Sequence, residues 1–321
     1  MSDAEFTELF ARAGCRGWLC VREVDGDGEV ACGADQPVAA ASVFKVVVAL
    51  EVYRQASSGA LDPGQRIRLR PQERTPGPTG LSVFADEAEL SVRDLVTMML
   101  TISDNAATDA LTDRVGLDRV RATLAELEMP GTVIPGALRD ELDVIGRDAG
   151  FGSWAGLERA APGLTAEAAQ RAQRLMIASS ALDSRRGIRT TARETARLLR
   201  LIWRDEAGPA QACDAVRQAM ARQVTRQRLA VGFGRSGVQV AAKSGTLLGL
   251  VRNEAGVIRM PDGRRYAAAV FTRADRQWDR EHEINTAIGA AAALAVGQLR
   301  SVSCGRSASP ASPHAAGPGR R

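Results

Sequence analysis

Residues 238–274 read VQVAAKSGTLLGLVRNEAGVIRMPDGRRYAAAVFTRA. The apolar runs rich in β-branched residues at 238–242, 250–259 and 265–273 predict three strands. Pro-Asp-Gly at 261–263 is typical of a tight turn and joins the last two strands. The stretch therefore predicts an antiparallel meander.

Further strand and helix signals lie near both ends of the chain. Residues 17–24 and 29–32 flank the sequence Asp-Gly-Asp-Gly, which indicates a β-hairpin with a glycine-rich turn. A helix is expected near residues 3–13, and a second helix over 279–300 would cover the sheet. The tail 301–321 is rich in serine, proline and glycine and is expected to be disordered.

The middle of the chain has a mostly helical pattern. The apolar run 43–53 has the length and flanks of a buried helix, although its β-branched residues alone would favour a strand. Residues 59–80 are rich in proline, glycine and arginine and indicate a loop, whereas 91–115 return to an amphipathic helical pattern. A helical lobe is expected from about 117 to 230, with its clearest helices over 117–128, 166–179 and 191–203.

Lysine is nearly absent from this chain of 321 residues. Only Lys45 and Lys243 occur, beside forty arginines. A buried lysine, unlike an arginine, can shift its pKa far enough to hold or pass a proton near neutral pH. Both lysines are therefore candidate functional groups, although a GC-rich coding sequence explains the general scarcity of lysine equally well.

Ser42 lies at the start of the expected helix, and Lys45 follows one turn later, so that both side chains project from one helical face. A neutral Lys45 would then take the proton of the Ser42 hydroxyl. The two histidines, His282 in the last helix and His314 in the tail, argue against a Ser-His-Asp triad. The alternative is that Ser42 caps the helix and Lys45 extends into solvent.

Two further polar motifs have both a functional and a structural interpretation. Ser103-Asp104-Asn105 interrupts the helical pattern of 91–115 and offers a hydroxyl for proton relay and a carboxamide for a substrate amide, or it ends one helix and caps the next. Lys243-Ser244-Gly245 ends a predicted strand. Its glycine permits close approach of the backbone to a ligand and its lysine gives positive potential, or it is simply a polar strand end.

The three motifs together resemble those of the penicillin-recognising serine enzymes, and most closely the class A β-lactamases. Ser-x-x-Lys, Ser-Asp-Asn and Lys-Ser-Gly follow one another in the family's order, with 61 positions (103 − 42) between the first two serines. Residues 90–95 and Arg252-Asn253-Glu254 add to the resemblance, which covers roughly residues 14–298.

The resemblance implies an α/β (α+β) fold, a sandwich of an antiparallel sheet flanked by helices together with an all-helical lobe. A single domain is expected over 1–300. Its sheet would come from 14–35 and 236–298, and its helical lobe would span about 45–230.

The resemblance also assigns roles to individual residues. Ser42 would be acylated, Lys45 would be the acylation base or proton relay, and Ser103 would return the proton to the leaving nitrogen. The backbone N–H groups of Ser42 and Thr246 would form an oxyanion hole. Arg252 would assist in binding a substrate carboxylate, or it is an exposed strand arginine. The expected substrate-binding residues are Asn105, Lys243, Ser244, Gly245, Thr246 and Arg252.

The chain departs from the family between Asn105 and Lys243, where it is longer than the family pattern. Residues 139–143 are the nearest match to the deacylation loop, which makes Glu141 the candidate general base. The asparagine expected downstream is missing, and Asp183 is a candidate partner for the loop arginine. The competing interpretation is that Glu141 is an exposed acid. The inserted segment 140–189 would reshape the pocket.

Composition excludes several other classes. The net charge of +4 comes from arginines scattered among acids, and aromatic residues make up only 4%, which argues against nucleic-acid binding. No apolar stretch reaches membrane-spanning length, and the acidic, amphipathic N-terminus lacks the pattern of a secretory signal. We therefore expect a cytoplasmic protein with no membrane partner.

The five cysteines have no metal-ligand spacing, so neither a metal nor, without a phosphate-binding glycine loop, an organic cofactor is expected. Free thiols are predicted, with one bridge between Cys20 and Cys32 across the hairpin left open. The cysteines are at positions 15, 20, 32, 213 and 304.

The motifs predict a monomeric serine hydrolase that cleaves an amide, such as a β-lactam, or an ester through an acyl-Ser42 intermediate. The substrate would be a small molecule bearing a carboxylate. One alternative is an acyltransferase or esterase of small-molecule biosynthesis, and another is a non-catalytic penicillin-binding-like module. Retention of both lysines argues against the last of these.

Overall fold

The computed structural model describes residues 2–234 and 237–306, with side chains as far as Ser301. Within these residues, five strands form one antiparallel sheet in the order β2-β1-β9-β8-β7. The order places the N-terminal hairpin beside the C-terminal meander, so the predicted sheet is confirmed. The strands are β1 (Cys15–Glu23), β2 (Glu29–Cys32), β7 (Gln239–Leu247), β8 (Val251–Arg259) and β9 (Arg265–Ala274).

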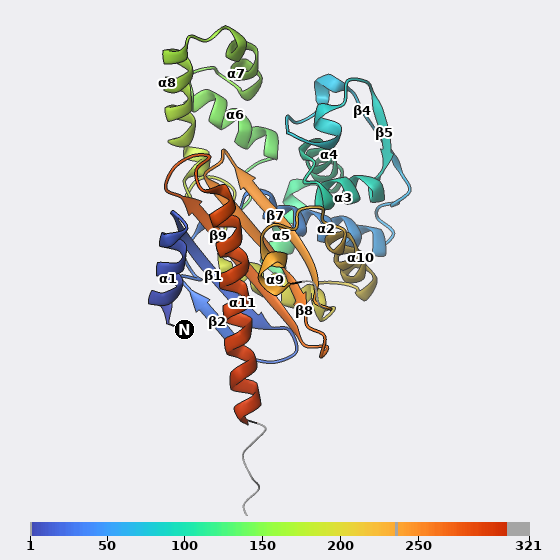
Figure 1. Cartoon of the computed structure of the whole chain (residues 1–321). Coiled ribbons are helices and arrows are strands. Elements are labelled where there is room, and N and C mark those ends of the chain that lie inside the picture. The colour runs from blue at the N-terminus through green and yellow to red at the C-terminus, as the bar shows by residue number, and fades with distance from the viewer. Residues whose placement is uncertain (1, 235–236, 307–321) are drawn as a thin grey trace, which may run out of the picture.

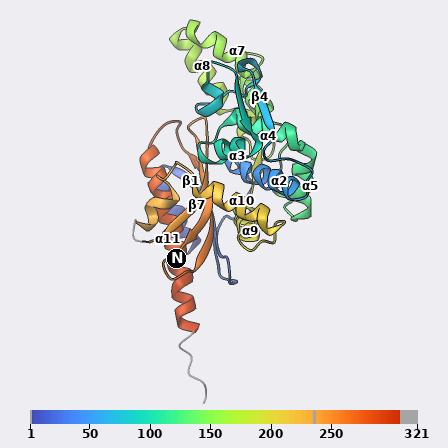
Figure 2. The same ribbon diagram turned by 90° about the vertical axis from the view of Figure 1, so that its right-hand side faces the viewer.

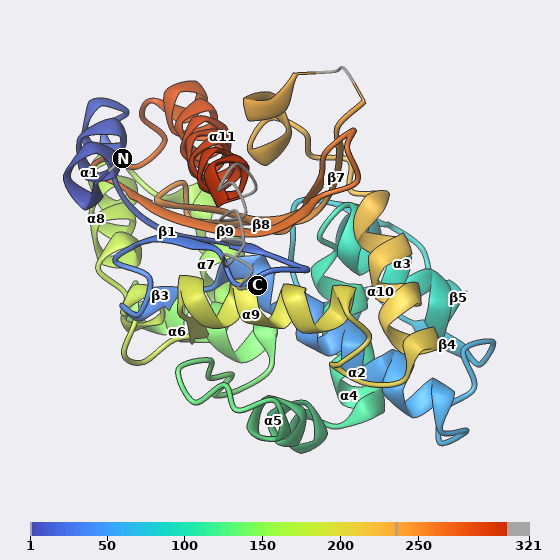
Figure 3. The same cartoon turned by 90° about the horizontal axis from the view of Figure 1, so that it is seen from below.

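Helices cover both faces of this sheet. Helices α1 (Asp3–Arg12) and α11 (Glu281–Arg306) lie on one face, and α9 (Ala192–Trp203) lies on the other (Figure 3). Strand β8 is consequently buried at every position except its last, Arg259, which explains why its sequence is apolar without the alternation of a half-exposed strand. The predicted α/β sandwich is the observed fold.

The helical lobe packs beside the sheet, on the side of β7 (Figures 1 and 2). Its central helix, α2 (Lys45–Ser57), is buried at every residue from Lys45 to Val52. Burial on all sides explains how a helix so rich in valine is stable, because tertiary packing outweighs the low helix propensity of β-branched residues. Around it lie α3 (Val92–Thr101), α4 (Asn105–Val115), α5 (Leu117–Glu126) and α10 (Ala210–Ala221).

The long segment between the second and third motifs forms a separate group of helices at the top of Figure 1. Leu142, Ile145 and Ala181 form a small apolar cluster there, against which Leu247 and Leu248 at the end of β7 pack. The insertion therefore reaches the same end of the sheet as the third motif. Its helices are α6 (Leu138–Asp148), α7 (Trp154–Ala160) and α8 (Ala166–Ile177).

Several predicted boundaries were wrong. The lobe is not all helical, because β4 (Arg66–Leu69) in the expected loop pairs with β5 (Ala88–Ser91). The sequence of this strand, Arg-Ile-Arg-Leu, alternates charged and apolar residues, and both arginines form ion pairs with Glu89 on the neighbouring strand. A further two-stranded sheet joins β3 (Val38–Ala39) to β6 (Arg189–Thr190).

Helix α11 also passes its predicted end at residue 300 and continues to Arg306. The expected disorder of 307–321 falls outside the described residues. Short 3₁₀ turns complete the chain, at η1 (Ala41–Phe44), η2 (Pro71–Glu73), η3 (Gly80–Val83), η4 (Ala161–Gly163), η5 (Ser180–Leu182) and η6 (Leu229–Phe233).

Cys20 and Cys32 are both buried free thiols. Cys20 lies opposite Ala31 in the hairpin register, and Cys32 lies opposite Leu19, so the two side chains point to opposite faces of the sheet. The bridge left open by the sequence is therefore not formed.

No helix in the described part of the chain is long and apolar enough to cross a membrane.

Candidate active site

Ser42 lies in the 3₁₀ turn η1, which runs directly into α2. A 3₁₀ turn repeats every three residues, so that Ser42 and Lys45 face the same side. The preceding residue, Ala41, has a φ of 43°, in the left-handed region that alanine rarely adopts. Strain of this kind costs about 1 to 3 kcal/mol and often accompanies active sites, because only tight surroundings can hold it.

Strand β7 lies directly against the amide of Ser42. A methyl group added at Gly245 would come within 3.1 Å of the Ala40 carbonyl oxygen and 3.2 Å of the Ser42 nitrogen. A side chain there would require its neighbours to shift by a few tenths of an ångström. The glycine thus lets β7 lie close to the backbone of the first motif.

Lys45 is fully buried, and its ammonium donates to three oxygens. Nζ lies 2.7 Å from the Ser103 carbonyl oxygen, 3.3 Å from Ser103 Oγ and 2.8 Å from Asn105 Oδ1. Burial lowers the pKa of Lys45 to about 7, against the opposing pull of the acids Asp104, Asp109 and Glu141. The pKa of this side chain therefore lies close to neutral pH.

The Ser103-Asp104-Asn105 motif joins α3 to α4 and performs both of its predicted structural tasks. Ser103 has a φ of 64°, and Asp104 caps α4 through Ala107 N while also accepting from Leu81 N at 2.6 Å. Asn105 donates to the Pro76 carbonyl at 2.8 Å and accepts from Lys45. The capping that the sequence offered as an alternative thus coexists with a direct contact to Lys45.

Lys243 is fully buried in the middle of β7, where its ammonium donates to the Ser244 carbonyl at 2.7 Å. The prediction that the third motif ends a strand was wrong, because β7 stays paired with β8 as far as Leu247. Burial, together with the charges of Lys45 and Arg228, holds the pKa of Lys243 well below its usual value. The two lysines of the chain therefore lie near each other in one buried region. Their scarcity in the sequence had singled out this pair.

Arg228 is a residue of this site that sequence reasoning missed. Its guanidinium donates to the Gly245 and Asn253 carbonyls and, through Nη2, to Thr246 Oγ1 at 2.7 Å. It therefore holds the ends of β7 and β8 together beside the third motif. It is one of forty arginines, and nothing in the sequence around it distinguishes it from the others.

Arg252 is not the exposed strand arginine of the competing interpretation, because its side chain is only 1% exposed. It lies opposite Thr246 in the β7–β8 register and donates to Glu281 Oε1 at 2.5 Å. Among the described residues, its Nε and Nη2 atoms have no hydrogen-bond partner. These two donor atoms are buried, on the strand that pairs with the third motif.

Glu141 is buried on the first turn of α6 and accepts from the Ile188 backbone N–H at 3.0 Å. Burial raises its pKa to about 7, so the interpretation as an ordinary exposed acid is wrong. The suggested pairing of Asp183 with the loop arginine is also wrong. Arg139 instead contacts Asp113 at 2.5 Å and Asp109 at 4.0 Å.

Asp109 is a second residue that the sequence did not reveal. Its buried carboxylate accepts from the backbone N–H groups of Leu138 and Arg139, each at 2.8 Å, and from Thr75 Oγ1 at 2.5 Å. These N–H groups belong to the first turn of α6, so that Asp109 caps the helix that carries Glu141. The contact joins the insertion to α4 and thus to the second motif.

Substitution Asp109→Asn is expected to lower the free energy of unfolding by about 2 to 4 kcal/mol, because it replaces a carboxylate that accepts three buried hydrogen bonds. Urea unfolding followed by circular dichroism measures the loss. Asp113→Asn, one turn along α4 and 56% exposed, is the matched control and should cost less than about 1 kcal/mol. Equal costs would contradict the capping role.

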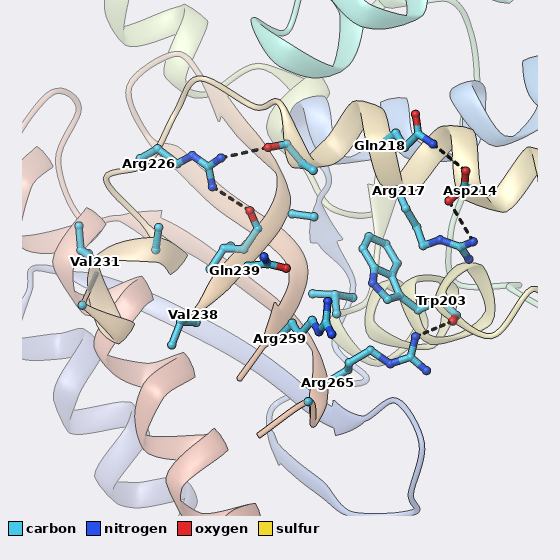
Figure 4. A pocket seen from close by; sticks show the side chains of 17 residues that line it. Trp203, Asp214, Arg217, Gln218, Arg226, Val231, Val238, Gln239, Arg259 and Arg265 are labelled. Carbon is cyan, nitrogen blue, oxygen red and sulfur yellow. Dashed lines mark hydrogen bonds and ion pairs between the residues drawn. The ribbon is translucent and has the colours of Figure 1, made fainter. Parts of the chain in front are cut away.

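A large cavity lies away from these residues. It measures about 1390 Å³ and is lined by residues of α10, η6 and β7, together with Trp203, Arg259 and Arg265 (Figure 4). Arg217 and Arg226 also line it, but they are bonded to Asp214 and to backbone carbonyls, respectively. No motif residue lines it, so we do not place the reaction there.

Within the described ranges, no three histidine, cysteine or acidic side chains are grouped as metal ligands.

Comparisons with known proteins agree with this fold. A β-lactamase regulatory protein, BlaB of Streptomyces cacaoi, is 29% identical over 280 residues, which cover 84% of this chain and 88% of that protein. The structure of a β-lactamase from Sphaerobacter thermophilus DSM 20745 superposes with a TM-score of 0.72 at 23% identity, covering 94% of this chain and 96% of that one.

The structure of PBP-A superposes with a TM-score of 0.71 at 22% identity, covering 92% of this chain and 96% of that one. A mutant of PBP-A is known as an acyl-enzyme complex with penicillin G. The family model described as the beta-lactamase enzyme family matches residues 2–299. With its three motifs gathered at one end of a class A β-lactamase fold, the chain belongs to the beta-lactamase enzyme family.

Proposed function

We propose that the protein is a serine hydrolase that a β-lactam, or another small amide or ester, acylates on Ser42. Its membership of the beta-lactamase family supports hydrolase-like chemistry in general. The observation that carries the proposal is the buried Lys45 ammonium, which is hydrogen-bonded to Ser103 and one 3₁₀ turn from Ser42. With a pKa lowered to about 7, much of Lys45 is neutral at physiological pH and able to accept a proton.

In the acylation step, the Ser42 oxygen bonds to the substrate carbonyl carbon while its proton passes to neutral Lys45. The amides of Ser42 and Thr246 would stabilise the oxyanion. As the bond from carbon to the leaving nitrogen or oxygen breaks, the proton moves from Lys45 through Ser103 Oγ, 3.3 Å away, to the leaving atom. Neutral Lys45 and an acyl-Ser42 ester remain, and Asn105 would orient the acyl amide.

The charge around the third motif favours a substrate that bears a carboxylate. Lys243 and the guanidinium groups of Arg228 and Arg252 lie in or beside the third motif, and Ser244 and Thr246 supply hydroxyl groups there. Arg252 keeps two donor atoms without partners. A carboxylate commonly accepts two hydrogen bonds at once from the N–H groups of a guanidinium.

Release of the acyl group is proposed to use Glu141 as the base that activates water. A second candidate function is a β-lactam sensor that keeps its acyl group. One observation favours it. The buried residues that follow Glu141 on α6 are Leu142 and Ile145, and neither has a side-chain amide that could hold a water molecule. The similarity to a regulatory protein points the same way.

Incubation with a fluorescent penicillin, followed by intact mass spectrometry over time beside a Ser42→Ala control, tests the proposal. We expect an adduct on the wild-type protein and none on the control. A transient adduct with hydrolysed drug identifies a β-lactamase, and a persistent adduct identifies a sensor. Absence of an adduct with penicillins, and with activated esters tested in parallel, would refute acylation of Ser42.

Acylation is expected to depend on pH through Lys45. The neutral amine is the reactive form, so the single-turnover acylation rate should rise as pH increases through about 7 and level off above about pH 8. Stopped-flow fluorescence with excess protein isolates this step from the titration of Glu141 during release. A rate independent of pH between about 6 and 8 would contradict proton transfer to Lys45.

A further inference from the structure

A second pocket, separate from the motif residues, opens on the sheet face that carries Trp18. Side chains two residues apart on a strand point to the same face, so Arg16 and Trp18 of β1 lie beside Phe271 and Arg273 of β9. The pocket measures about 360 Å³, within the range of small-molecule sites. The segments 37–39 and 177–184 form its walls, and Val251 and Asn253 of β8 complete the floor.

Two arginines face each other across this floor. Arg16 and Arg273 are direct partners in the β1–β9 register, and like charges so placed repel each other. Arg16 lies over the Trp18 ring at 5.4 Å, and Arg273 donates to the Leu182 carbonyl at 3.1 Å. Neither makes an ion pair with a carboxylate of the described residues. An anion placed between them would relieve the repulsion.

Beneath the arginines, the floor includes the aromatic residues Trp18 and Phe271. Phe271 is 1% exposed, and the Trp18 indole is oriented by its hydrogen bond to Gln36 at 2.8 Å. Asp183 stands at the rim, exposed, and accepts from the Arg185 backbone N–H. We propose that this pocket binds a small aromatic carboxylate, with its ring against Trp18 and its carboxylate between Arg16 and Arg273.

The pocket is connected to the backbone that carries Ser42. Asn253, on the floor, donates to the Ala39 and Ala40 carbonyls at 2.9 and 3.2 Å, three and two residues before Ser42, respectively. The Ala40 N–H donates to the Ile188 carbonyl at 3.0 Å, and the Ile188 N–H in turn binds Glu141. A ligand here would therefore contact Ala39 and Asn253, which adjoin the backbone of Ser42, without occupying the motif site.

Isothermal titration calorimetry of the Ser42→Ala protein with 2-naphthoate tests the site without requiring any reaction. The expected dissociation constant is on the order of 0.1 mM, given the ligand's size. Arg16→Gln, at an exposed residue, and Arg273→Gln, which keeps a donor for Leu182, should each weaken binding at least about tenfold. The neutral 2-naphthamide should likewise bind at least about tenfold more weakly.

Lys243→Ala distinguishes this pocket from the proposed carboxylate site at the third motif, because it removes that site's buried ammonium. Binding of 2-naphthoate should persist in this variant. Loss of binding in Lys243→Ala, unchanged binding in both arginine variants, equal binding of the amide, or no heat at several millimolar 2-naphthoate would each overturn the proposal. Because Ser42 is absent throughout, a failure here leaves the proposed acylation untouched.

Discussion

Substitution Lys45→Arg is expected to slow acylation of Ser42 by about 10² to 10⁴-fold, the usual range for loss of a general base. Arginine keeps the positive charge but does not release its proton near neutral pH, whereas burial lowers the pKa of Lys45 to about 7. The rate of adduct formation with a fluorescent penicillin, measured with excess protein, gives the effect directly.

Because the guanidinium is larger than the ammonium it replaces, Lys45→Met serves as a second variant of smaller volume. Met removes both charge and proton acceptor at this fully buried position, and should slow acylation to a similar extent. Urea unfolding of both variants establishes that each is folded before rates are compared. Adduct formation at the wild-type rate in either folded variant would exclude Lys45 as the base.

Substitution Glu141→Gln is expected to lengthen the lifetime of the acyl-enzyme by about 10² to 10⁴-fold if Glu141 activates the releasing water. Glutamine keeps the size of the side chain and an oxygen for the Ile188 N–H, which lies 3.0 Å from Glu141 Oε1, but cannot take a proton from water. Intact mass spectrometry after removal of free penicillin follows the decay of the adduct.

Glu167→Gln, on the exposed surface of α8 in the same insertion, is the matched control and should leave the lifetime unchanged. An adduct that decays equally fast in wild type and Glu141→Gln would show that another group activates the water. An adduct that does not decay in the wild type would instead favour the sensor, because release would then be missing from the native protein.

The sequence alone predicted the meander of residues 238–274, the hairpin beside it and the buried helix after Ser42. It also singled out Lys45 and Lys243, which the fold buries near each other. These features were readable because each rests on local information, namely the spacing of apolar residues, turn residues and short motifs in order. Strand β4 was not predicted because two of its four residues are arginines, and its pairing with β5 and the packing of Ile67 and Leu69 on the core appear only in the fold.

Other properties were decided by tertiary structure. Burial raises the pKa of Glu141, and the N–H of Ile188, 47 positions away, partly opposes this shift. The start of α6 depends on Asp109 from another helix. Arg228 differs from the other arginines only through the carbonyls it meets on β7 and β8. Burial and charge come from contacts between segments distant in the chain, and therefore only the assembled fold defines them.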